Sequence, residues 1–457
     1  MTKDMTTGTP WKLLLMFGLP LFVGNVFQQA YNLVDIMIVG KFVGPVALAG
    51  VGVASPVFNL INALLIGLSV GSSIMVSQLY GARRDKELPT AMTTILLISL
   101  IMALVLTVLG QLLAQPLLQV LGTPEEDLPY SVAYLRTIIM GLTFNVFYNQ
   151  LSGLLRGLGN SRVPLYFLVL ASVLNVVLDL LFVAVFRWGV PGAAGATILA
   201  QGISAALTWV YIRVRVPQFQ RTKGSPLVSR EMLRAMVRFG LPMALQQGSI
   251  SMGHILLQWL INPFGTVVIG AFASASKIDL FTLMPTMSIG SAVSTFTAQN
   301  AGAGRMDRIG QGCRAANVMA ISVSALLGGI VWMNRRWLIG MFLSSEEFPE
   351  LAADMISAGA EILSILPCFY VVLVVVNMHQ SVISGAGDTM FSMLTCVGMM
   401  GLRIVLAWCF IYLLGMDQRG IWWAFPASWA IIMVLVLIYY YGGWWKQKTG
   451  LERKKET

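Results

Sequence analysis

The sequence predicts an all-α polytopic membrane protein with twelve transmembrane helices, arranged as two six-helix lobes that are related by a pseudo-two-fold axis along the membrane normal. Three observations lead to this fold class. Hydrophobic residues make up 57% of the chain and charged residues only 11%, which is more apolar than a soluble domain with a wetted surface allows. Apolar runs of bilayer-spanning length recur along the chain, and the second half repeats motifs of the first.

The apolar runs define the expected helices. A hydrocarbon core about 30 Å thick requires about 20 apolar residues per helix. The runs that meet this requirement are 11–39, 46–78, 90–115, 130–155, 164–186, 191–214, 233–262, 267–300, 312–334, 353–383, 390–414 and 420–445. We expect the first run to remain in the mature protein, because it carries several polar residues and lacks the small-residue cleavage site of a signal peptide.

The net charge of +10 is an orientation signal and does not indicate nucleic-acid binding. With an even number of spans, most basic residues fall in loops on one side, at Lys3, Lys12, Arg83, Arg84, Lys86, Arg156, Arg162, residues 213–238, Arg305, Arg308, Arg314 and residues 446–455. The positive-inside rule then places both termini in the cytoplasm. The acidic loop at Glu125, Glu126 and Asp127 faces the other side. We therefore expect a multi-pass protein of a bacterial or archaeal plasma (inner) membrane.

An internal repeat defines the domain organisation. Phe17-Gly18-Leu19-Pro20 recurs as Phe239-Gly240-Leu241-Pro242, and Gln78-x-x-Gly81-Ala82 recurs at nearly the same offset as Gln299-x-x-Gly302-Ala303. The segment Gly157-Leu158-Gly159-Asn160-Ser161 returns at a slightly larger offset as Gly385-Ala386-Gly387-Asp388-Thr389. Each copy holds six spans and inserts in the same orientation. The predicted division is an N-lobe at 1–214, a cytoplasmic linker at 215–232 and a C-lobe at 233–457. Two such bundles can rock against each other, so that a cleft between them opens alternately to the two sides of the membrane.

Polar residues of the first lobe point to an ion site. Asn25, Gln28, Asn32 and Asp35 step by three or four along the first span, so they share one helix face. Asn175 and Asp179 lie four apart on the fifth span, and Thr197 follows the start of the sixth. From the distances of these residues to the outer ends of their helices, Asp35, Asp179 and Thr197 lie about 9 to 12 Å below the outer surface. They can therefore meet.

Two carboxylates within apolar helices are unusual, because each costs about 2.5 to 3.5 kcal/mol at the centre of a membrane and such residues mark ion pathways. Burial and mutual repulsion both favour the protonated form, so this pair can exchange protons with the outer aqueous phase. The competing interpretation is that Asp35 reaches the interface and Asp179 merely accepts hydrogen bonds. Pro20 removes one hydrogen bond from the first span and either permits bending there or produces a static kink.

Other polar residues have a structural alternative. Gln247 and His254 belong to the equivalent stripe of span seven, and Lys277, Asp279, Glu361 and Arg403 are also within membrane spans. These four charges balance, so they can form an ion-pair network or belong to the substrate path. The stripe of Ser55, Asn59, Asn62, Ser69 and Ser73 on span two can line a cleft or allow close helix packing, and we favour packing.

The motifs resemble those of the multidrug and toxic compound extrusion (MATE) transporters. The first-helix motif of that family is similar to Gln28 to Asp35 with Val39-Gly40. Its loop signatures resemble Gln78-Leu79-Tyr80-Gly81-Ala82 and Gln299-Asn300-Ala301-Gly302-Ala303, and its motif after span four resembles Leu155 to Asn160. The resemblance implies twelve helices in two lobes. It also implies that Asp35, Asn175, Asp179 and Thr197 form the cation site and that Pro20 is the bend of helix 1. Residues 233–262 lack an Asp or Glu, which favours the proton-coupled DNA-damage-inducible F branch.

The resulting hypothesis is a cation-coupled antiporter, with protons as the coupling ion, that exports amphiphilic or cationic drugs and toxic organic compounds by alternating access. The chain is then not an enzyme, is a monomer in the lipid bilayer, and uses no cofactor and no resident metal. Sodium is the alternative coupling ion, bound at Asp35 and Asp179. A further alternative is a flippase for lipid-linked saccharides, whose cavity is expected to contain more basic residues. We find no metal-ligand cluster and no nucleophile beside a base that would indicate an enzyme.

Overall fold

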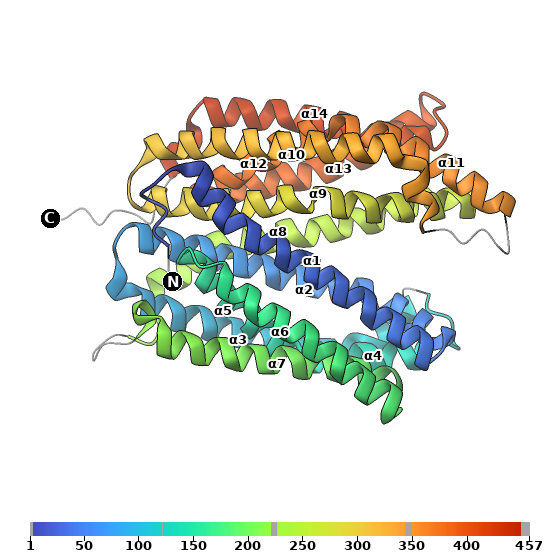
Figure 1. The fold of residues 1–457 in the computed structure, drawn as a ribbon, viewed down its shortest axis with the longest axis horizontal. Helices are drawn as coiled ribbons and strands as arrows, with labels where there is room; N and C mark the ends of the chain where they lie inside the picture. The colour runs from blue at the N-terminus through green and yellow to red at the C-terminus, as the bar shows by residue number, and fades with distance from the viewer. Residues whose placement is uncertain (1–2, 121, 221–225, 343–348, 449–457) are drawn as a thin grey trace. The chain divides into compact units, whose positions relative to one another are not determined.

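The computed structural model describes residues 3–120, 122–220, 226–342 and 349–448, so residues 221–225 of the expected linker lie outside the described part of the chain. Within these ranges all regular structure is helical (Figure 1). Ten stretches are long and apolar enough to cross a membrane, and the bent pair α4 and α5 adds an eleventh. One of the ten, residues 230–302, contains two helices. The described residues therefore provide the twelve predicted spans.

The first half of the chain forms the following elements: α1 (Pro10–Phe42), α2 (Pro45–Gly81), η1 (Asp85–Glu87), α3 (Leu88–Val120), α4 (Leu128–Met140), α5 (Leu142–Gly157), α6 (Arg162–Asp179), η2 (Leu180–Val185), α7 (Gly189–Arg215) and η3 (Pro217–Phe219). The expected fourth span is broken at Gly141, where α4 and α5 meet with a bend of 47°. The expected fifth span continues from α6 into the π-helix η2 immediately after Asp179. Single π turns inside helices occur frequently at functional sites.

The second half repeats this order: α8 (Arg230–Ile261), η4 (Asn262–Phe264), α9 (Gly265–Gly302), α10 (Met306–Gly340), α11 (Pro349–Ile365), η5 (Leu366–Phe369), α12 (Tyr370–Ala386), α13 (Thr389–Tyr412), α14 (Arg419–Tyr441) and η6 (Trp444–Lys448). The expected tenth span is interrupted by η5, which contains Pro367. This interruption falls in the fourth span of the second half, as the break at Gly141 does in the first. The two copies thus share the break in their fourth span as well as the order of their helices.

The residues cluster into two compact units. Unit 1 comprises Met1–Asp4 and Pro20–Gly248, and unit 2 comprises Met5–Leu19 and Ser249–Thr457. The division within α1 falls at Pro20, although α1 is one continuous helix from Pro10 to Phe42. The expected lobe boundaries at 214 and 233 remain predictions.

Glycines allow α2 to approach α8 closely inside unit 1. An ideal Cβ built on Gly67 would lie 2.3 Å from the backbone oxygen of Met243, and one on Gly71 would lie 2.4 Å from the Cα of Gly240. Any side chain at either position would displace backbone atoms. Gly240 belongs to the repeated Phe-Gly-Leu-Pro motif, so this motif contributes directly to helix packing.

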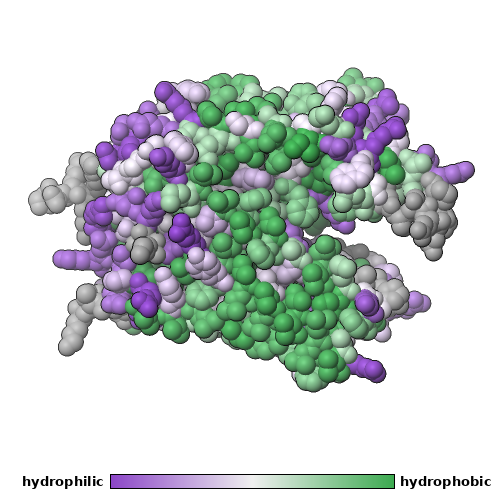
Figure 2. Space-filling view, viewed as in Figure 1, coloured by the Kyte–Doolittle hydropathy of each residue, from purple (hydrophilic) through white to green (hydrophobic). Residues whose placement is uncertain are grey.

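The loops at the ends of the helices carry the charged contacts. Arg84 pairs with Glu87 at 2.6 Å and with Glu231 at 2.8 Å. Hydrogen bonding to Glu87 raises the pKa of Arg84 above its ordinary value, and Glu231 contributes in the same direction. On the face shown in Figure 2, hydrophobic residues cover the middle of the helices, while hydrophilic residues gather toward their ends. This distribution is the one required of helices that contact lipid.

Candidate ion and substrate site

A cavity of about 390 Å³ lies inside unit 1, between the C-terminal half of α1 and helices α2, α4, α5, α6 and α7. Its lining is rich in amides and hydroxyls and includes one carboxylate, from Asp35. Among the described residues that line it, none is a lysine or an arginine. The cavity can therefore favour a cationic or hydrogen-bond-donating guest over an anion.

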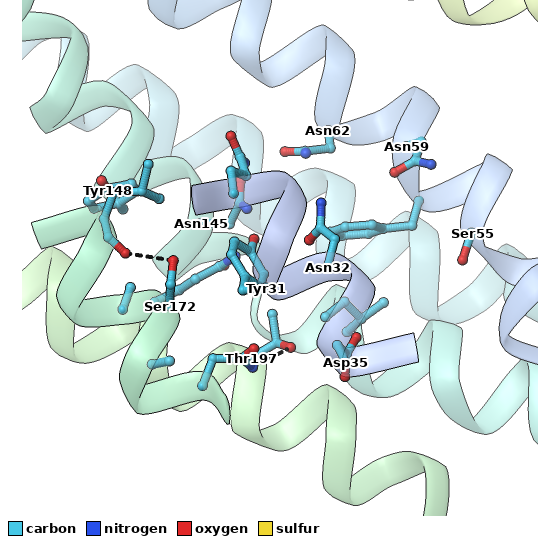
Figure 3. Close-up of a pocket in the computed structure, with 18 of the residues that line it drawn as sticks. Tyr31, Asn32, Asp35, Ser55, Asn59, Asn62, Asn145, Tyr148, Ser172 and Thr197 are labelled. Atoms are coloured by element: carbon cyan, nitrogen blue, oxygen red, sulfur yellow. Dashed lines mark hydrogen bonds between the residues drawn. The ribbon is translucent and has the colours of Figure 1, made fainter. Parts of the chain in front are cut away.

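The polar stripe of α1 supplies one wall of this cavity. Gln28, Asn32 and Asp35 line it, together with Gln29, Tyr31 and Ile36, whereas Asn25 does not. Figure 3 labels Tyr31, Asn32 and Asp35 along α1 and shows Asn59 and Asn62 of α2 facing the same space. The C-terminal end of α1 packs into a cluster of buried apolar residues that includes Ile38, Val39, Val51, Val183 and Val190. This packing fixes the position of Asp35 relative to α7 and η2.

Asp35 and Asp179 come together. Asp179 is 0% exposed at the end of α6, and its carboxyl group lies within hydrogen-bonding reach of that of Asp35. No described N–H or O–H group donates to either oxygen of Asp179, and Oδ1 of Asp35 is also buried without a donor. Three buried carboxylate oxygens thus lack a hydrogen-bond donor, an arrangement that a shared proton or a bound cation would satisfy.

Asn175 and Thr197 adjoin these acids. The side-chain amide of Asn175 donates to Oγ1 of Thr197 at 3.2 Å, and Thr197 donates to the backbone oxygen of Ala193 at 3.2 Å. The other atom of this amide, the buried Oδ1 of Asn175, has no hydrogen-bond donor among the described residues. Both residues line the cavity. The structure therefore brings all four predicted site residues to the same region of unit 1, with only acceptor oxygens unsatisfied.

The cavity contains residues that our sequence reasoning missed or misjudged. Ser55, Asn59 and Asn62 line it, whereas Ser69 donates to the backbone oxygen of Asn149 at 2.6 Å and packs between α2 and α5. The α2 stripe thus divides into a cavity part and a packing part. Asn145, Tyr148 and Asn149 of α5 also line the cavity, and their positions three and four apart along a helix were the signal that could have identified them.

The polar residues singled out in the second half do not form one network. Glu361 pairs with Arg419 at 2.6 Å, and the hydroxyl of Tyr370 donates to Asp279. Lys277 lies over the ring of Phe342 at 5.6 Å and is exposed. No salt bridge joins Lys277, Asp279, Glu361 and Arg403 to one another in the part of the chain that the structure describes. His254 is exposed on α8, and Gln247 belongs to unit 1.

A model of the family MatE matches residues 20–181 and 242–409, which is most of the chain. The protein belongs to the MatE family. Members of this family are membrane transporters and not enzymes, as the sequence predicted.

Relatives cover almost the whole of this transporter. The probable multidrug resistance protein YoeA of Bacillus subtilis is 26% identical over 443 residues, which are 95% of this chain and 94% of that protein. A MOP superfamily transporter from Pyrococcus furiosus, reported with a binding pocket of reversed polarity that suggests a different function, superposes with a TM-score of 0.90 at 26% identity over 98% of both chains. A MATE solved in a straight and in a bent conformation superposes with a TM-score of 0.88 at 26% identity, over 97–98% of this chain and 98–99% of that chain.

The family assigns small molecules as the substrates of this transporter. The cavity in unit 1 is large enough for such a guest, because ligand pockets of about 300 to 1,000 Å³ hold drug-sized molecules. A proton or a small cation can bind to the carboxyl end of the same cavity. The site thus places a cavity of ligand size beside the carboxyl groups of Asp35 and Asp179.

Proposed function

We propose that this transporter exports amphiphilic and cationic drugs in exchange for protons, with Asp35 and Asp179 as the coupling pair. The single observation that carries the proposal is the contact between two carboxyl groups, three of whose four oxygens are buried without a described hydrogen-bond donor. Two like charges at this separation in a poorly solvated site repel, so one proton is held between them when the site is open to acid. Loss of that proton leaves a negative site that attracts a cationic drug.

Drug and proton compete in this mechanism. The deprotonated pair, with the acceptor oxygens of Asn175 and Asn62, attracts a cationic guest, and protonation neutralises the pair and weakens that attraction. Export then follows because the two forms of the site are exposed to opposite sides in alternation. The named relative YoeA, described as a probable multidrug resistance protein, supports this substrate class.

Bending of α1 at Pro20 is the proposed mechanical step. Pro20 lacks the N–H that would continue the helix ladder, and the boundary between the two units falls at this residue. Protonation at Asp35, near the C-terminal end of α1, can therefore bend this helix at Pro20, where one backbone hydrogen bond is missing. The MATE solved in straight and bent conformations supports such a step.

Sodium is the second candidate for the coupling ion, because carboxylate, amide and hydroxyl oxygens are also the ligands that a sodium ion accepts, and three carboxylate oxygens here lack a donor. A lipid-linked saccharide flippase is disfavoured, because the described lining of the cavity contains no basic residue to hold a pyrophosphate. We further propose that the transporter functions as a monomer in the inner membrane, since the cavity is formed within one chain.

Dye efflux from proteoliposomes tests the proposal. Under an imposed pH gradient without sodium, Asp35→Asn and Asp179→Asn should each reduce the initial efflux rate about tenfold or more, because the coupling free energy is lost. Glu126→Gln, at an exposed loop acid, is the matched control and should behave as wild type. Gradient-driven efflux that survives in either aspartate variant contradicts the mechanism, and efflux driven only by a sodium gradient assigns sodium as the ion.

A further inference from the structure

The second repeat holds a buried arginine at the position that an amide occupies in the first. Arg403 is related to Asn175 by the same offset that relates Gly385 to Gly157 and Thr389 to Ser161. By this offset Asp179 corresponds to Ala407, and by the offset between Pro20 and Pro242 Asp35 corresponds to Leu257. Both counterparts are buried apolar residues. In unit 2 the two acids are therefore replaced by apolar side chains, and a neutral amide is replaced by a guanidinium.

No acidic side chain among the described residues pairs with the guanidinium of Arg403. Arg403 is 4% exposed, on the buried face of α13 that also carries Met399 and Ala407. Of the acids that the sequence places within membrane spans of unit 2, Asp279 accepts a hydrogen bond from Tyr370, Glu361 pairs with Arg419, and Asp354 is exposed near the start of α11. Arg403 donates only to the sulfur of Met400, at 3.7 Å, and its Nε has no partner in the described structure. A buried guanidinium normally pairs with a carboxylate or a phosphate.

Aromatic rings of α14 frame the guanidinium. Its Cζ lies 4.1 Å from the ring centroid of Phe425 and 5.9 Å from that of Trp429. Trp429 is 3% exposed, and its indole N–H is also buried without an acceptor. Cation–π contact offsets part of the cost of burying the charge, but it leaves the Nε–H of Arg403 and the indole N–H of Trp429 without acceptors. The orphaned groups here are donors, whereas those of Asp35, Asp179 and Asn175 are acceptors.

We propose that Arg403 and Trp429 form an oxyanion-binding site in unit 2 that recognises the carboxylate of zwitterionic substrates. The planar guanidinium offers paired N–H donors that match the two oxygens of a carboxylate, and the indole N–H adds a further donor. This inference rests on the proposed export of amphiphilic drugs and narrows the substrates to those that also carry an acid group.

The depth of Arg403 favours a substrate over a lipid headgroup. Arg403 lies fourteen residues after the start of α13 at Thr389, or about 21 Å along the helix. The opposite end of α13 at Tyr412 is nine residues away, or about 13 Å. A phosphate at either surface therefore lies far from the guanidinium. A molecule that is carried across the membrane passes through this depth, whereas a phosphate held at the surface does not.

A matched pair of dyes tests the site without any ion gradient. A rhodamine with a free carboxylate and its methyl ester share one chromophore, so fluorescence polarisation gives both dissociation constants on full-length protein in phosphatidylcholine nanodiscs. The quantity measured is the ratio of the ester constant to the acid constant. Arg403→Gln should lower this ratio about tenfold or more, because a charged hydrogen-bonded pair is lost. Arg403→Lys keeps the positive charge but loses the paired N–H donors of the guanidinium, and Trp429→Phe keeps an aromatic ring but loses the indole N–H. Each of these variants should lower the ratio less than Arg403→Gln does.

Arg419→Gln is the control, since it removes a positive charge of unit 2 that already has a carboxylate partner, and it should leave the ratio unchanged. An unchanged ratio in Arg403→Lys and Trp429→Phe, or a loss in Arg419→Gln equal to that in Arg403→Gln, overturns the proposal. The same measurement is repeated in nanodiscs that also contain phosphatidylglycerol. If Arg403→Gln changes dye binding only in the nanodiscs with phosphatidylglycerol, the site binds a lipid phosphate and the proposal is overturned. Binding is measured without a gradient, so failure here is distinct from failure of proton coupling.

Discussion

At the scale of single residues, the sequence identified the acids better than their surroundings. Asp35, Asn175, Asp179 and Thr197 were predicted from helical spacing and depth, and the structure brings them to one region of unit 1. Two carboxylates in an apolar helix bundle are costly enough to be conspicuous in any sequence. Amides such as Asn145 and Asn149 are less conspicuous, because a helix can turn them toward a cavity, a neighbouring helix or a backbone carbonyl with similar cost.

The hydroxyl of Thr197 provides a prediction at this scale. Thr197→Val keeps the shape of the side chain but removes the acceptor of the Asn175 amide, leaving a buried donor unsatisfied beside the acids. We expect the rate of pH-driven efflux to fall about fivefold, since one neutral hydrogen bond is worth about 1 kcal/mol. Initial efflux rates in proteoliposomes measure the effect.

Thr208→Val is the matched control. Thr208 is buried on the same helix and donates to the backbone oxygen of Ser204 at 2.6 Å, but it does not line the cavity. If both variants lose activity equally, the loss reflects the helix and not the site. An effect of Thr197→Val as large as that of Asp179→Asn would show that the hydroxyl itself binds the coupling ion.

At the scale of elements, the hydropathy of the chain predicted every span and none of the irregularities within spans. The break at Gly141 and the 3-10 turn at Leu366–Phe369 both lie inside continuous apolar runs. Hydropathy cannot detect them, because a bent span and a straight one expose the same amount of apolar surface to lipid. Pro367 was visible as a local signal. The π turn after Asp179 had no comparable signal, since residues 180–185 are uniformly apolar.

Pro20 provides the prediction for α1. Pro20→Ala restores a donor to the helix ladder and removes the ring that weakens it. If bending at this residue is a step of transport, the variant should retain dye binding, transport more slowly and unfold at a higher temperature. Efflux rate, equilibrium dye binding and thermal unfolding in detergent are the three measurements.

Pro116→Ala in α3 separates a specific hinge from a general effect of proline in a membrane helix. This residue lies within a helix that does not line the cavity. Its substitution should raise stability without slowing efflux. Wild-type efflux by Pro20→Ala would contradict a hinge in α1 and leave the static-kink interpretation.

At the scale of the whole molecule, the repeat carried more information than either half alone. It predicted that the two halves share their helices, and the structure extends this agreement to the interruptions in their fourth spans. It also revealed where the halves differ, since the positions of Asp35 and Asp179 correspond to Leu257 and Ala407. The coupling chemistry that we propose therefore belongs to unit 1 alone. The corresponding part of unit 2 is free to recognise another part of the substrate.

Orientation in the membrane is the last prediction, and it follows from charge. The loops joining α2 to α3 and α9 to α10 carry Arg83, Arg84 and Arg305, and Arg308 follows in the first turn of α10, whereas the loop joining α3 to α4 carries Glu125 and Glu126. Moving arginine across a bilayer is costly, so the arginine-rich loops and both termini should face the cytoplasm. A green fluorescent protein fused at the C-terminus should fluoresce, and alkaline phosphatase fused after Glu126 should be active. Active phosphatase at the C-terminus would reverse the topology and expose Asp35 and Asp179 to the cytoplasmic side, which proton-driven export does not permit.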